Sequence, residues 1–310
     1  MTGPASRTTL PLWAVRLLMV LLFIIWANAF TAIKQCREML PPMELVLARF
    51  LPVALLALAW LLSSRRRLGE AREALRAAPL RLAAMGLTGV AGYNYFIFLA
   101  QTEIKPGAAA LLTTLSPLFT LILATVFLRE RVPLRRIIGI AVAFAGLFFV
   151  VRWGRIGLGR VTDVPNAEMR YTLIAAAAPL CWSLYTILGK DLVRTWSPAA
   201  VTGLPILIGT IPLLPLATPA FFGRLAGFGW THWASLLYLS VMSTIVGFFI
   251  WNYALRRLPA TSTAAFIYLN PPFAALFGWL LFGEEITGRF LAGSAVVLLG
   301  LWMTQHRSGS

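Results

Sequence analysis

One stretch of this chain occurs twice, and it decides the fold. Residues 115–147 read LSPLFTLILATVFLRERVPLRRIIGIAVAFAGL, and residues 269–301 read LNPPFAALFGWLLFGEEITGRFLAGSAVVLLGL. At a constant offset of 154 residues, without a gap, they share proline, glutamate, arginine and glycine positions: Pro117/Pro271, Glu130/Glu284, Arg135/Arg289, Gly139/Gly293 and Gly146/Gly300. Apolar helices match by chance, but prolines and charged residues in one register indicate an internal repeat.

The repeat reaches the start of each half. At an offset of 156 residues, the first helices share two positions: Trp26/Trp182 and Lys34/Lys190. The chain therefore divides into two units, residues 1–155 and residues 156–310, within one membrane domain. Residues 17–29 resemble a signal peptide with an A-x-A cleavage site, but their pairing with the second half favours a retained first helix.

Composition indicates an integral membrane protein. The chain is 59% hydrophobic and 12% charged, with a mean hydropathy of +0.79, whereas roughly a quarter of the residues of a soluble domain are charged. The net charge of +16 would suggest nucleic acid in a soluble protein. Here the arginines flank apolar runs, where they contact lipid headgroups, so we expect a bilayer and no nucleic-acid partner. Cys36 and Cys181 have no CxxC spacing or histidine partner, so no cofactor, metal or disulfide is expected.

Ten apolar runs lie along the chain. A transmembrane helix needs about 20 apolar residues, and shorter runs span when flanking arginines snorkel to the interface. The runs are Leu12–Ala32, Met43–Leu62, Leu82–Ala100, Ala108–Leu128, Ile137–Val151, Thr172–Leu188, Ala200–Leu216, Trp233–Leu255, Ala260–Phe282 and Phe290–Met303. The sequence therefore predicts an all-α integral membrane protein with ten transmembrane helices.

Basic residues predict the orientation of these helices. Lys and Arg are more numerous in the loops on the side of the two termini, which predicts cytoplasmic termini in a multi-pass inner-membrane protein. The loop that carries Arg152, Arg155, Arg160 and Arg170 runs against this orientation.

The repeat also predicts a mechanism. Each unit holds five predicted spans, an odd number, so the second unit enters the membrane inverted relative to the first. Inverted repeats are typical of secondary transporters that work by alternating access. A channel, which would conduct without saturation, and an intramembrane enzyme are the alternatives. An enzyme is disfavoured because His232 and His306 lie outside the span centres and neither HExxH nor GxSxG is present.

Several motifs carry a family resemblance over nearly the whole chain. LSPLFTLILATVFLRERV (115–132) and LNPPFAALFGWLLFGEEI (269–286), with ALRRLPATSTAA (254–265) and the ARF of residues 48–50, resemble the drug/metabolite transporter superfamily. The resemblance is to ten-helix exporters built from two EamA domains. It implies export of amino acids or other metabolites, and an aromatic amino-acid exporter is the relative it suggests. The motif departs from the repeat at Arg131, where the second copy has Glu285.

Prolines in the middle of two spans predict the substrate site. Pro117, Pro271 and Pro272 would break their helices and free carbonyls at mid-membrane depth, as in the central sites of inverted-repeat transporters. The candidate substrate-binding residues are polar and aromatic side chains of several spans: Trp26, Asn28, Tyr93, Asn94, Tyr95, Thr113, Ser116, Trp182, Tyr185, Trp251, Asn252, Tyr268 and Asn270. The alternatives are a kink that only shapes the packing, and hydrogen bonds between helices for the serines and threonines.

Charged residues narrow the substrate class. No carboxylate lies at the middle of a predicted span, which argues against a cation/proton antiporter and favours a neutral, zwitterionic or anionic substrate. Glu130 and Glu284 close the fourth and ninth spans, where we expect them to pair with nearby arginines. Arg49 is the one cation well inside a span. Because it lies about 9 Å from the helix start, snorkelling or a structural ion pair is favoured over substrate binding.

These observations predict an inner-membrane exporter of small metabolites, with neutral or aromatic amino acids as the expected substrates. Drugs, nucleosides and other metabolites are the alternative substrates. Both a monomer and a dimer are compatible with the sequence.

Overall fold

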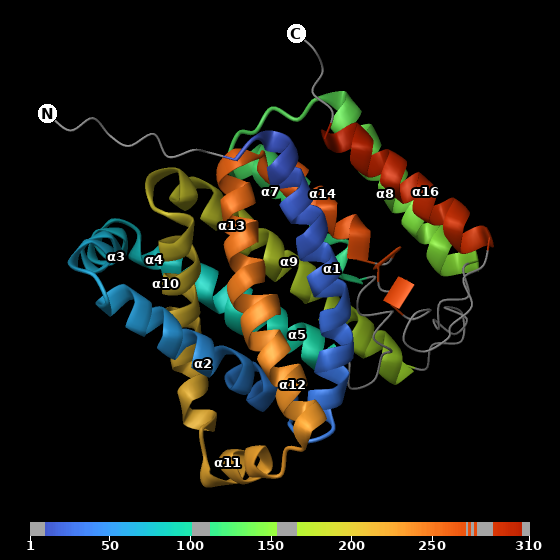
Figure 1. The fold of residues 1–310 in the computed structure, drawn as a ribbon. Helices are drawn as coiled ribbons and strands as arrows, with labels where there is room; N and C mark the ends of the chain where they lie inside the picture. The colour runs from blue at the N-terminus through green and yellow to red at the C-terminus, as the bar shows by residue number, and fades with distance from the viewer. Residues whose placement is uncertain are drawn as a thin grey trace, which may run out of the picture.

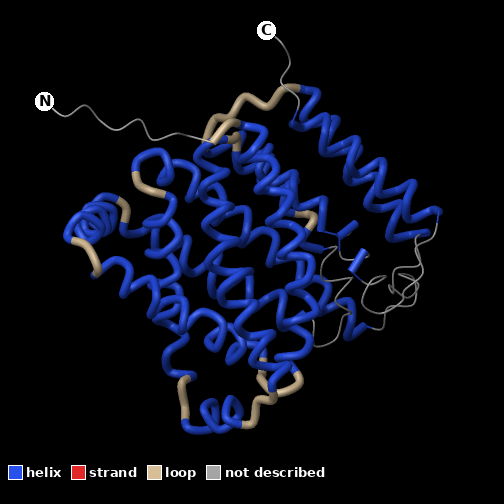
Figure 2. Tube along the Cα trace, in the orientation of Figure 1, coloured by secondary structure: helices blue, strands red, loops and turns tan. Residues whose placement is uncertain are grey.

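The computed structural model describes residues 10–100, 112–153, 166–270, 272–273, 276–277 and 288–305. These residues form helices joined by short loops, and they contain no strand (Figure 2). Five helical segments among them are long and apolar enough to cross a membrane: Leu12–Arg37, Pro42–Leu62, Pro79–Leu99, Pro198–Leu216 and Trp230–Arg257. The chain is therefore an all-helical, multi-pass membrane protein.

The first half contains eight described elements. They are α1 (Leu12–Arg37), α2 (Pro42–Leu62), α3 (Arg65–Ala77), α4 (Pro79–Met85), η1 (Gly86–Gly92), α5 (Tyr93–Ala100), α7 (Ser116–Phe127) and α8 (Leu134–Trp153).

The second half contains ten described elements. They are α9 (Asn166–Thr195), α10 (Pro198–Thr210), η3 (Ile211–Leu216), α11 (Pro219–Ala226), α12 (Trp230–Tyr238), η4 (Leu239–Val246), α13 (Gly247–Arg257), α14 (Ala260–Ala265), η5 (Phe266–Leu269) and α16 (Gly288–Gln305).

The helices form a bundle with one pair at its edge. In Figure 1, α1 and the continuous rod α12–η4–α13 lie side by side, and α5 and α9 run behind them. Helices α8 and α16 pack against each other at one side of the bundle. The described ends of the chain meet on one side of the molecule, because the Arg16 Nη2 donates to the Gln305 carbonyl at 2.6 Å.

Glycines bring α8 and α16 into backbone contact. A Cβ atom built on Gly139 would lie 2.8 Å from the Gly300 carbonyl oxygen, and one built on Gly300 would lie 2.4 Å from the Ala143 nitrogen. Gly146 approaches the Val297 nitrogen in the same way. The two helices are therefore antiparallel, and small residues let their backbones pack closely, as is common between membrane helices.

Each half of the chain has one long helix that is interrupted by a π-helical segment. In the first half it is η1, between α4 and α5, and in the second half it is η4, between α12 and α13. The two segments end 154 residues apart, at Gly92 and Val246, which is the offset of the sequence repeat. Side chains satisfy backbone carbonyls that the wider turns leave free: the Asn94 Nδ2 donates to the Gly89 and Val90 carbonyls at 3.1 and 2.9 Å, and the Thr244 hydroxyl donates to the Leu239 carbonyl at 2.8 Å.

The helices around the mid-span prolines are also interrupted. A turn at Thr114 and Leu115 precedes α7, and Pro117 is the second residue of that helix. In the second half, α14 gives way to the 3-10 segment η5 just before Asn270. Pro272 follows within the described residues, whereas Pro271 lies outside them. Both interruptions occur where the prolines predict them.

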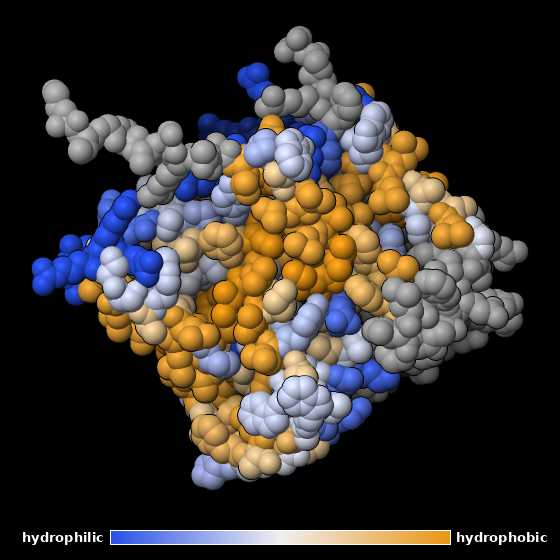
Figure 3. Space-filling view, in the orientation of Figure 1, coloured by the Kyte–Doolittle hydropathy of each residue, from blue (hydrophilic) through white to orange (hydrophobic). Residues whose placement is uncertain are grey.

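The outer surface is apolar over a wide area. Figure 3 shows a broad hydrophobic face over α1 and α13, while the arginine-rich α3 forms a polar tip. Large apolar side chains are exposed on this bundle, among them Leu17, Leu21, Leu55, Leu56, Leu237 and Phe249. Exposed apolar surface of this extent marks contact with the hydrocarbon core of a bilayer.

Candidate functional site

A small cavity lies at the centre of the bundle, where helices of both halves meet. Its volume is about 40 Å³, and its lining residues are Trp26, Ala29, Phe30, Ile33, Arg49, Tyr93, Asn94, Ile97, Phe98, Trp182, Ser243, Phe248, Ile267 and Asn270. One water molecule requires roughly 10–15 Å³ of such volume. The conformation is therefore closed around its centre, with room for water but not for a metabolite.

Trp182 of α9 is the centre of an aromatic wall. Its ring stacks on Tyr185 at 5.0 Å and meets Trp26 edge-on at 5.2 Å. Tyr93 and Phe248 lie 5.3 Å from it on other sides. Edge-to-face and offset contacts of this kind add roughly 0.5–1.5 kcal/mol per pair beyond burial. The cavity wall is consequently rigid and combines residues from both halves of the chain.

Two glycines create the space that this wall occupies. A Cβ atom on Gly247 would lie 2.5 Å from the Trp26 Nε1, and one on Gly89 would lie 2.3 Å from the Tyr185 Cδ2. Trp26 then donates a hydrogen bond of 2.9 Å to the Ser243 carbonyl. Gly89 within η1 and Gly247 next to η4 thus leave room for a large aromatic ring from a neighbouring helix.

Arg49 enters the cavity from α2. It is 5% exposed. The Nε donates to the Thr244 hydroxyl at 2.7 Å, the Nη1 to the Asn94 Oδ1 at 3.0 Å and the Nη2 to the Ser243 hydroxyl at 3.1 Å. All of these partners are neutral, and within the described parts of the chain Arg49 forms no ion pair. The expectation of snorkelling is therefore wrong: α2 is turned so that this side chain points inward, toward η4 and α5.

Two predicted residues, Asn252 and Trp251, lie behind the aromatic wall and contact Tyr185 and Trp182 of it. The Asn252 Nδ2 donates to the Tyr185 hydroxyl at 2.7 Å, to the Thr202 hydroxyl at 3.0 Å and to the Phe248 carbonyl at 3.1 Å. Trp251 is fully buried, with its ring 5.1 Å from that of Trp182. These residues support the wall and do not line the cavity.

The polar stripe on α7 faces a neighbouring helix. The Ser116 hydroxyl donates to the Pro179 carbonyl at 3.0 Å, and the Thr120 hydroxyl donates to the Ser183 hydroxyl at 3.0 Å. Ser183 in turn donates to the Ser116 carbonyl at 2.9 Å. Thr113 is fully buried on the same stripe and does not line the cavity. The stripe thus joins α7 to α9 by interhelical hydrogen bonds.

Three further candidates lie elsewhere. Asn28 lies beside the Tyr238 hydroxyl, which donates to the Ile25 carbonyl at 2.7 Å. Tyr95 contacts the Phe96 ring at 5.4 Å. Tyr268 is fully buried in a separate apolar cluster toward α8 and α16, with Ile140, Ala143 and Val297. The structure therefore brings five of the predicted residues to the cavity: Trp26, Tyr93, Asn94, Trp182 and Asn270.

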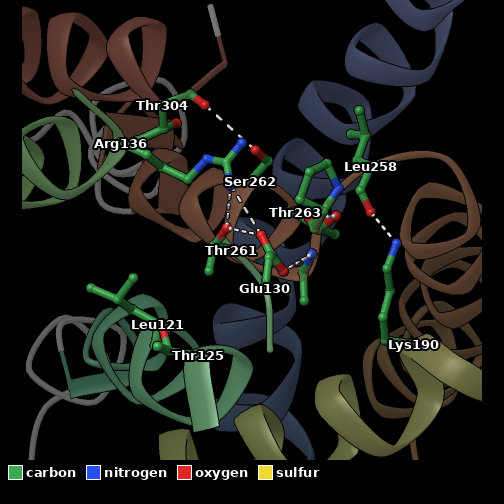
Figure 4. A network of polar contacts seen from close by, with 12 residues as sticks. Leu121, Thr125, Glu130, Arg136, Lys190, Leu258, Thr261, Ser262, Thr263 and Thr304 are labelled. Carbon is green, nitrogen blue, oxygen red and sulfur yellow. Dashed lines mark hydrogen bonds and ion pairs between the residues drawn. The ribbon is translucent and has the colours of Figure 1, made fainter. Parts of the chain in front are cut away.

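Polar contacts close the bundle on the side of the described termini. The Glu130 carboxylate accepts hydrogen bonds from the Arg136 Nη1 at 3.0 Å, the Thr261 hydroxyl at 2.5 Å and the Ala260 N–H at 3.2 Å (Figure 4). Nearby, the Lys190 Nζ donates to the Leu255 and Leu258 carbonyls at 2.5 Å each. The pairing of Glu130 with an arginine is confirmed. Glu284 lies outside the described residues.

The opposite end of the bundle is bridged as well. The Arg224 Nε of α11 donates to the Glu44 Oε2 of α2 at 2.8 Å, and this hydrogen bond raises the pKa of Arg224. His232 of α12 lies 3.8 Å from the Glu38 carboxylate. The closed cavity therefore has a polar bridge on each side.

Comparison with known proteins identifies the family to which this chain belongs. A model of the EamA-like transporter family matches residues 13–152 and, a second time, residues 169–305. The chain belongs to the EamA-like transporter family. The resemblance to the drug/metabolite transporter superfamily is thereby confirmed, and its members are transporters rather than enzymes.

Relatives of this EamA-like transporter match it over almost the full length. An "Uncharacterized transporter" of Archaeoglobus fulgidus is 28% identical over 91% of this chain and 95% of its own. A "Probable terminal-alkyne amino-acid exporter" of Streptantibioticus cattleyicolor is 31% identical over 96% and 93%. A "Probable amino-acid metabolite efflux pump" of Salmonella typhimurium is 27% identical over 92% and 93%. The chain is thus a transporter of small metabolites in a membrane.

One solved crystal structure shares the fold. It superimposes with a TM-score of 0.71 at 19% identity, and the match covers 94% of this chain and 95% of the other.

Several residues that line the cavity were not among those predicted from the sequence. Phe248 and Ser243 look like ordinary positions of an apolar helix, yet Phe248 lies 154 residues after Asn94, so the repeat offset would have found it. Arg49 carried a signal as the one cation well inside a predicted span.

Two buried polar atoms at the cavity have no partner among the described residues. They are the Trp182 Nε1, a donor, and the Asn270 Oδ1, an acceptor. Buried polar atoms are nearly always hydrogen-bonded in folded proteins. Unpaired groups that line a cavity are therefore available to water or to a bound solute.

Proposed function

We propose that this transporter exports amino acids with apolar or aromatic side chains across the inner membrane, by alternating access through the central cavity. The observation that carries the proposal is the aromatic wall around Trp182, together with two buried polar atoms at the cavity that have no partner among the described residues, the Trp182 Nε1 and the Asn270 Oδ1. Such a site offers apolar surface to a side chain and polar atoms to its charged groups. The printed names of two relatives, an amino-acid exporter and an amino-acid metabolite efflux pump, agree with this substrate class.

We propose ten transmembrane helices in two inverted five-helix repeats, over residues 1–155 and 156–310. The repeated family match supports this division. So do the paired π-helical segments η1 and η4 and the antiparallel contact of α8 with α16. The described ends lie on one side of the molecule, and the excess of Lys and Arg on that side supports a cytoplasmic location for them.

Alternating access then requires the two polar bridges to open in turn. The Glu130 contacts would form the cytoplasmic gate, and the Glu44–Arg224 contact would form the periplasmic gate. The helix interruptions just before Pro117 and at η5 would let the fourth and ninth spans bend as the gates move. Pro117, Pro271 and Pro272 are the proposed gating residues. With both gates closed, the cavity of about 40 Å³ must widen before it admits a metabolite.

The predicted site residues have different roles in this proposal. Trp26, Tyr93, Asn94, Trp182 and Asn270 would contact the substrate. Tyr185, Trp251 and Asn252 would hold the aromatic wall in position. Thr113 and Ser116 would join helices, and Asn28, Tyr95 and Tyr268 would have no direct contact with the substrate in this closed conformation.

The test is counterflow in proteoliposomes that contain the purified full chain. Vesicles are loaded with unlabelled phenylalanine, and uptake of labelled phenylalanine is followed without an ion gradient. We expect saturable exchange that falls at least about tenfold in Trp182→Ala, because the central ring of the wall is lost. Trp230→Ala, at a surface position that is 83% exposed, is the matched control.

Other outcomes separate the alternatives. Absence of exchange with every amino acid, in vesicles that hold folded protein, would refute the amino-acid proposal and direct the search to nucleosides and drugs. Flux that does not saturate would indicate a channel.

A further inference from the structure

The buried guanidinium of Arg49 is the least explained charge in the bundle. It is 5% exposed, and its hydrogen bonds within the described chain all go to hydroxyl and amide oxygens. Its Cζ also lies 5.1 Å from the centre of the Phe50 ring, which carries no net charge. A charged side chain at membrane depth costs several kcal/mol unless an opposite charge or water compensates it. Neutral dipoles orient the guanidinium without neutralising it.

A purely structural role would not require the charge. The three hydrogen bonds of Arg49 join α2 to η4 and α5, and a neutral amide side chain could provide donors to some of the same oxygens at a lower desolvation cost. The guanidinium also borders the cavity. A fixed, uncompensated cation that lines a cavity is the arrangement that receives an anion.

We propose that Arg49 binds the carboxylate of the transported solute, so that a free carboxylate is the element that this transporter recognises. The inference rests on the proposed function in taking the central cavity as the transport site. A guanidinium presents paired N–H donors whose spacing matches a carboxylate, and its charge offsets that of the anion. Thr244, Ser243 and Asn94 accept hydrogen bonds from its three nitrogens and so fix its direction.

The rest of the lining fits the remainder of such a solute. The Asn270 Oδ1 is buried and without a partner among the described residues, and it can accept a hydrogen bond from an ammonium group. The faces of Trp26, Trp182 and Tyr93 supply apolar contact for a side chain. The lining thus suits a solute that has only a carboxylate. It also suits an amino acid, whose ammonium group would contact Asn270.

Binding measurements on the purified full chain in lipid nanodiscs test this inference without any transport step. Isothermal titration calorimetry would compare two probes with the same phenyl group: 3-phenylpropionate, which has only the carboxylate, and 2-phenylethylamine, which has only the amine. We expect 3-phenylpropionate to bind at least about tenfold more tightly. Equal or tighter binding of 2-phenylethylamine would overturn the inference on the unmodified protein.

Substitutions of Arg49 test whether its side chain is the group that binds the carboxylate. In Arg49→Gln we expect 3-phenylpropionate to bind about 30-fold more weakly or not at all, since the buried charge partner is gone. In Arg49→Lys, the charge is kept but the paired donors are lost, so intermediate affinity is expected. Arg16→Gln removes a partly buried arginine outside the cavity and should bind as the unmodified protein does. A folded Arg49→Gln variant, judged by its melting temperature, that binds 3-phenylpropionate normally would overturn the inference. If that variant does not fold, the comparison of probes and Arg49→Lys still decide the matter.

Counterflow separates this inference from the proposed function. If no amino acid exchanges but 3-phenylpropionate binding depends on Arg49, amino-acid export fails and the carboxylate site stands for another organic acid. If labelled phenylalanine exchanges equally well in a folded Arg49→Gln variant, the carboxylate inference fails and amino-acid export stands.

Discussion

The Trp26 Nε1 donates a hydrogen bond of 2.9 Å to the carbonyl of Ser243, which joins the first helix of one half of the chain to the π-helical segment of the other. This contact places an indole ring at the edge of the central cavity. The contact is possible because Gly247, the first residue after the π-helical segment, has no side chain.

Gly247→Ala should disturb the cavity directly. The new Cβ would lie 2.5 Å from the Trp26 Nε1, so the ring must move and lose its hydrogen bond to Ser243. Overpacking of this kind costs about 1–3 kcal/mol. We expect a lower melting temperature and slower counterflow. Gly223→Ala is the control, because nothing lies within 4 Å of its Cβ. Unchanged exchange in Gly247→Ala would show that the position of Trp26 does not matter to transport.

Gly300→Ala should separate α16 from α8. The added Cβ would lie 2.4 Å from the backbone nitrogen of Ala143, and a backbone atom cannot rotate away as a side chain can. The expected result is a melting temperature at least several degrees lower, at about 2–4 °C per kcal/mol. Gly288→Ala, in the same helix but with open space at its Cβ, should leave the melting temperature unchanged. Equal melting temperatures for both variants would contradict the close packing of this pair.

Glu130 and Arg136 should be energetically coupled. Both side chains are only 15% exposed and their charged atoms lie 3.0 Å apart, so removal of one leaves the other buried and unpaired. In a double-mutant cycle of Glu130→Ala and Arg136→Ala, the double variant should lose less stability than the sum of the single variants, with a coupling of about 1–3 kcal/mol.

An exposed ion pair is the reference for that cycle. Asp191 and Arg194 lie 3.6 Å apart with side chains that are 41% and 67% exposed, and such pairs contribute about 0–1 kcal/mol. Coupling no larger at Glu130 and Arg136 than at this pair would argue against a stabilised gate.

Asn252→Leu should loosen the aromatic wall from behind. The change removes the donor to the Tyr185 hydroxyl, and a buried hydroxyl left without a partner costs about 1–3 kcal/mol. Thr202 loses the same donor but keeps its own hydrogen bond to the Phe248 carbonyl at 3.4 Å. The melting temperature should fall. Adding Tyr185→Phe should recover part of the loss, because the unpaired phenol oxygen is then gone. No recovery would mean that the Asn252–Tyr185 bond contributes little.

Much of the architecture was predictable because it depends on composition and periodicity. Apolar runs indicate membrane helices, and the shared register of Pro117 with Pro271 indicates a duplicated unit. The family match over both halves confirms that reading. The polar connection after the second run contains helix α3, whose Glu70 accepts a hydrogen bond from the Ser197 N–H; composition alone does not predict this contact.

The candidate site was predictable only in part. A periodic pattern places Trp182 and Tyr185 on one helix face, but it does not say which neighbour that face meets. Asn28 is two residues from Trp26 and contacts Tyr238 instead of the cavity. Tyr268 is two residues from Asn270 and packs toward α8. The rotation of each helix about its axis is set by packing against its neighbours, and no local signal records it.

The sequence by itself determined that this chain is an all-helical membrane transporter of the EamA-like family, with aromatic and amide residues in its spans. Hydrophobic length, charge and repetition are properties of the chain that need no neighbours to be read. Only the tertiary structure decided that Arg49 points inward and lies among neutral partners. The direction of a side chain, and the charge that remains uncompensated beside it, depend on helices up to 195 residues away in the sequence.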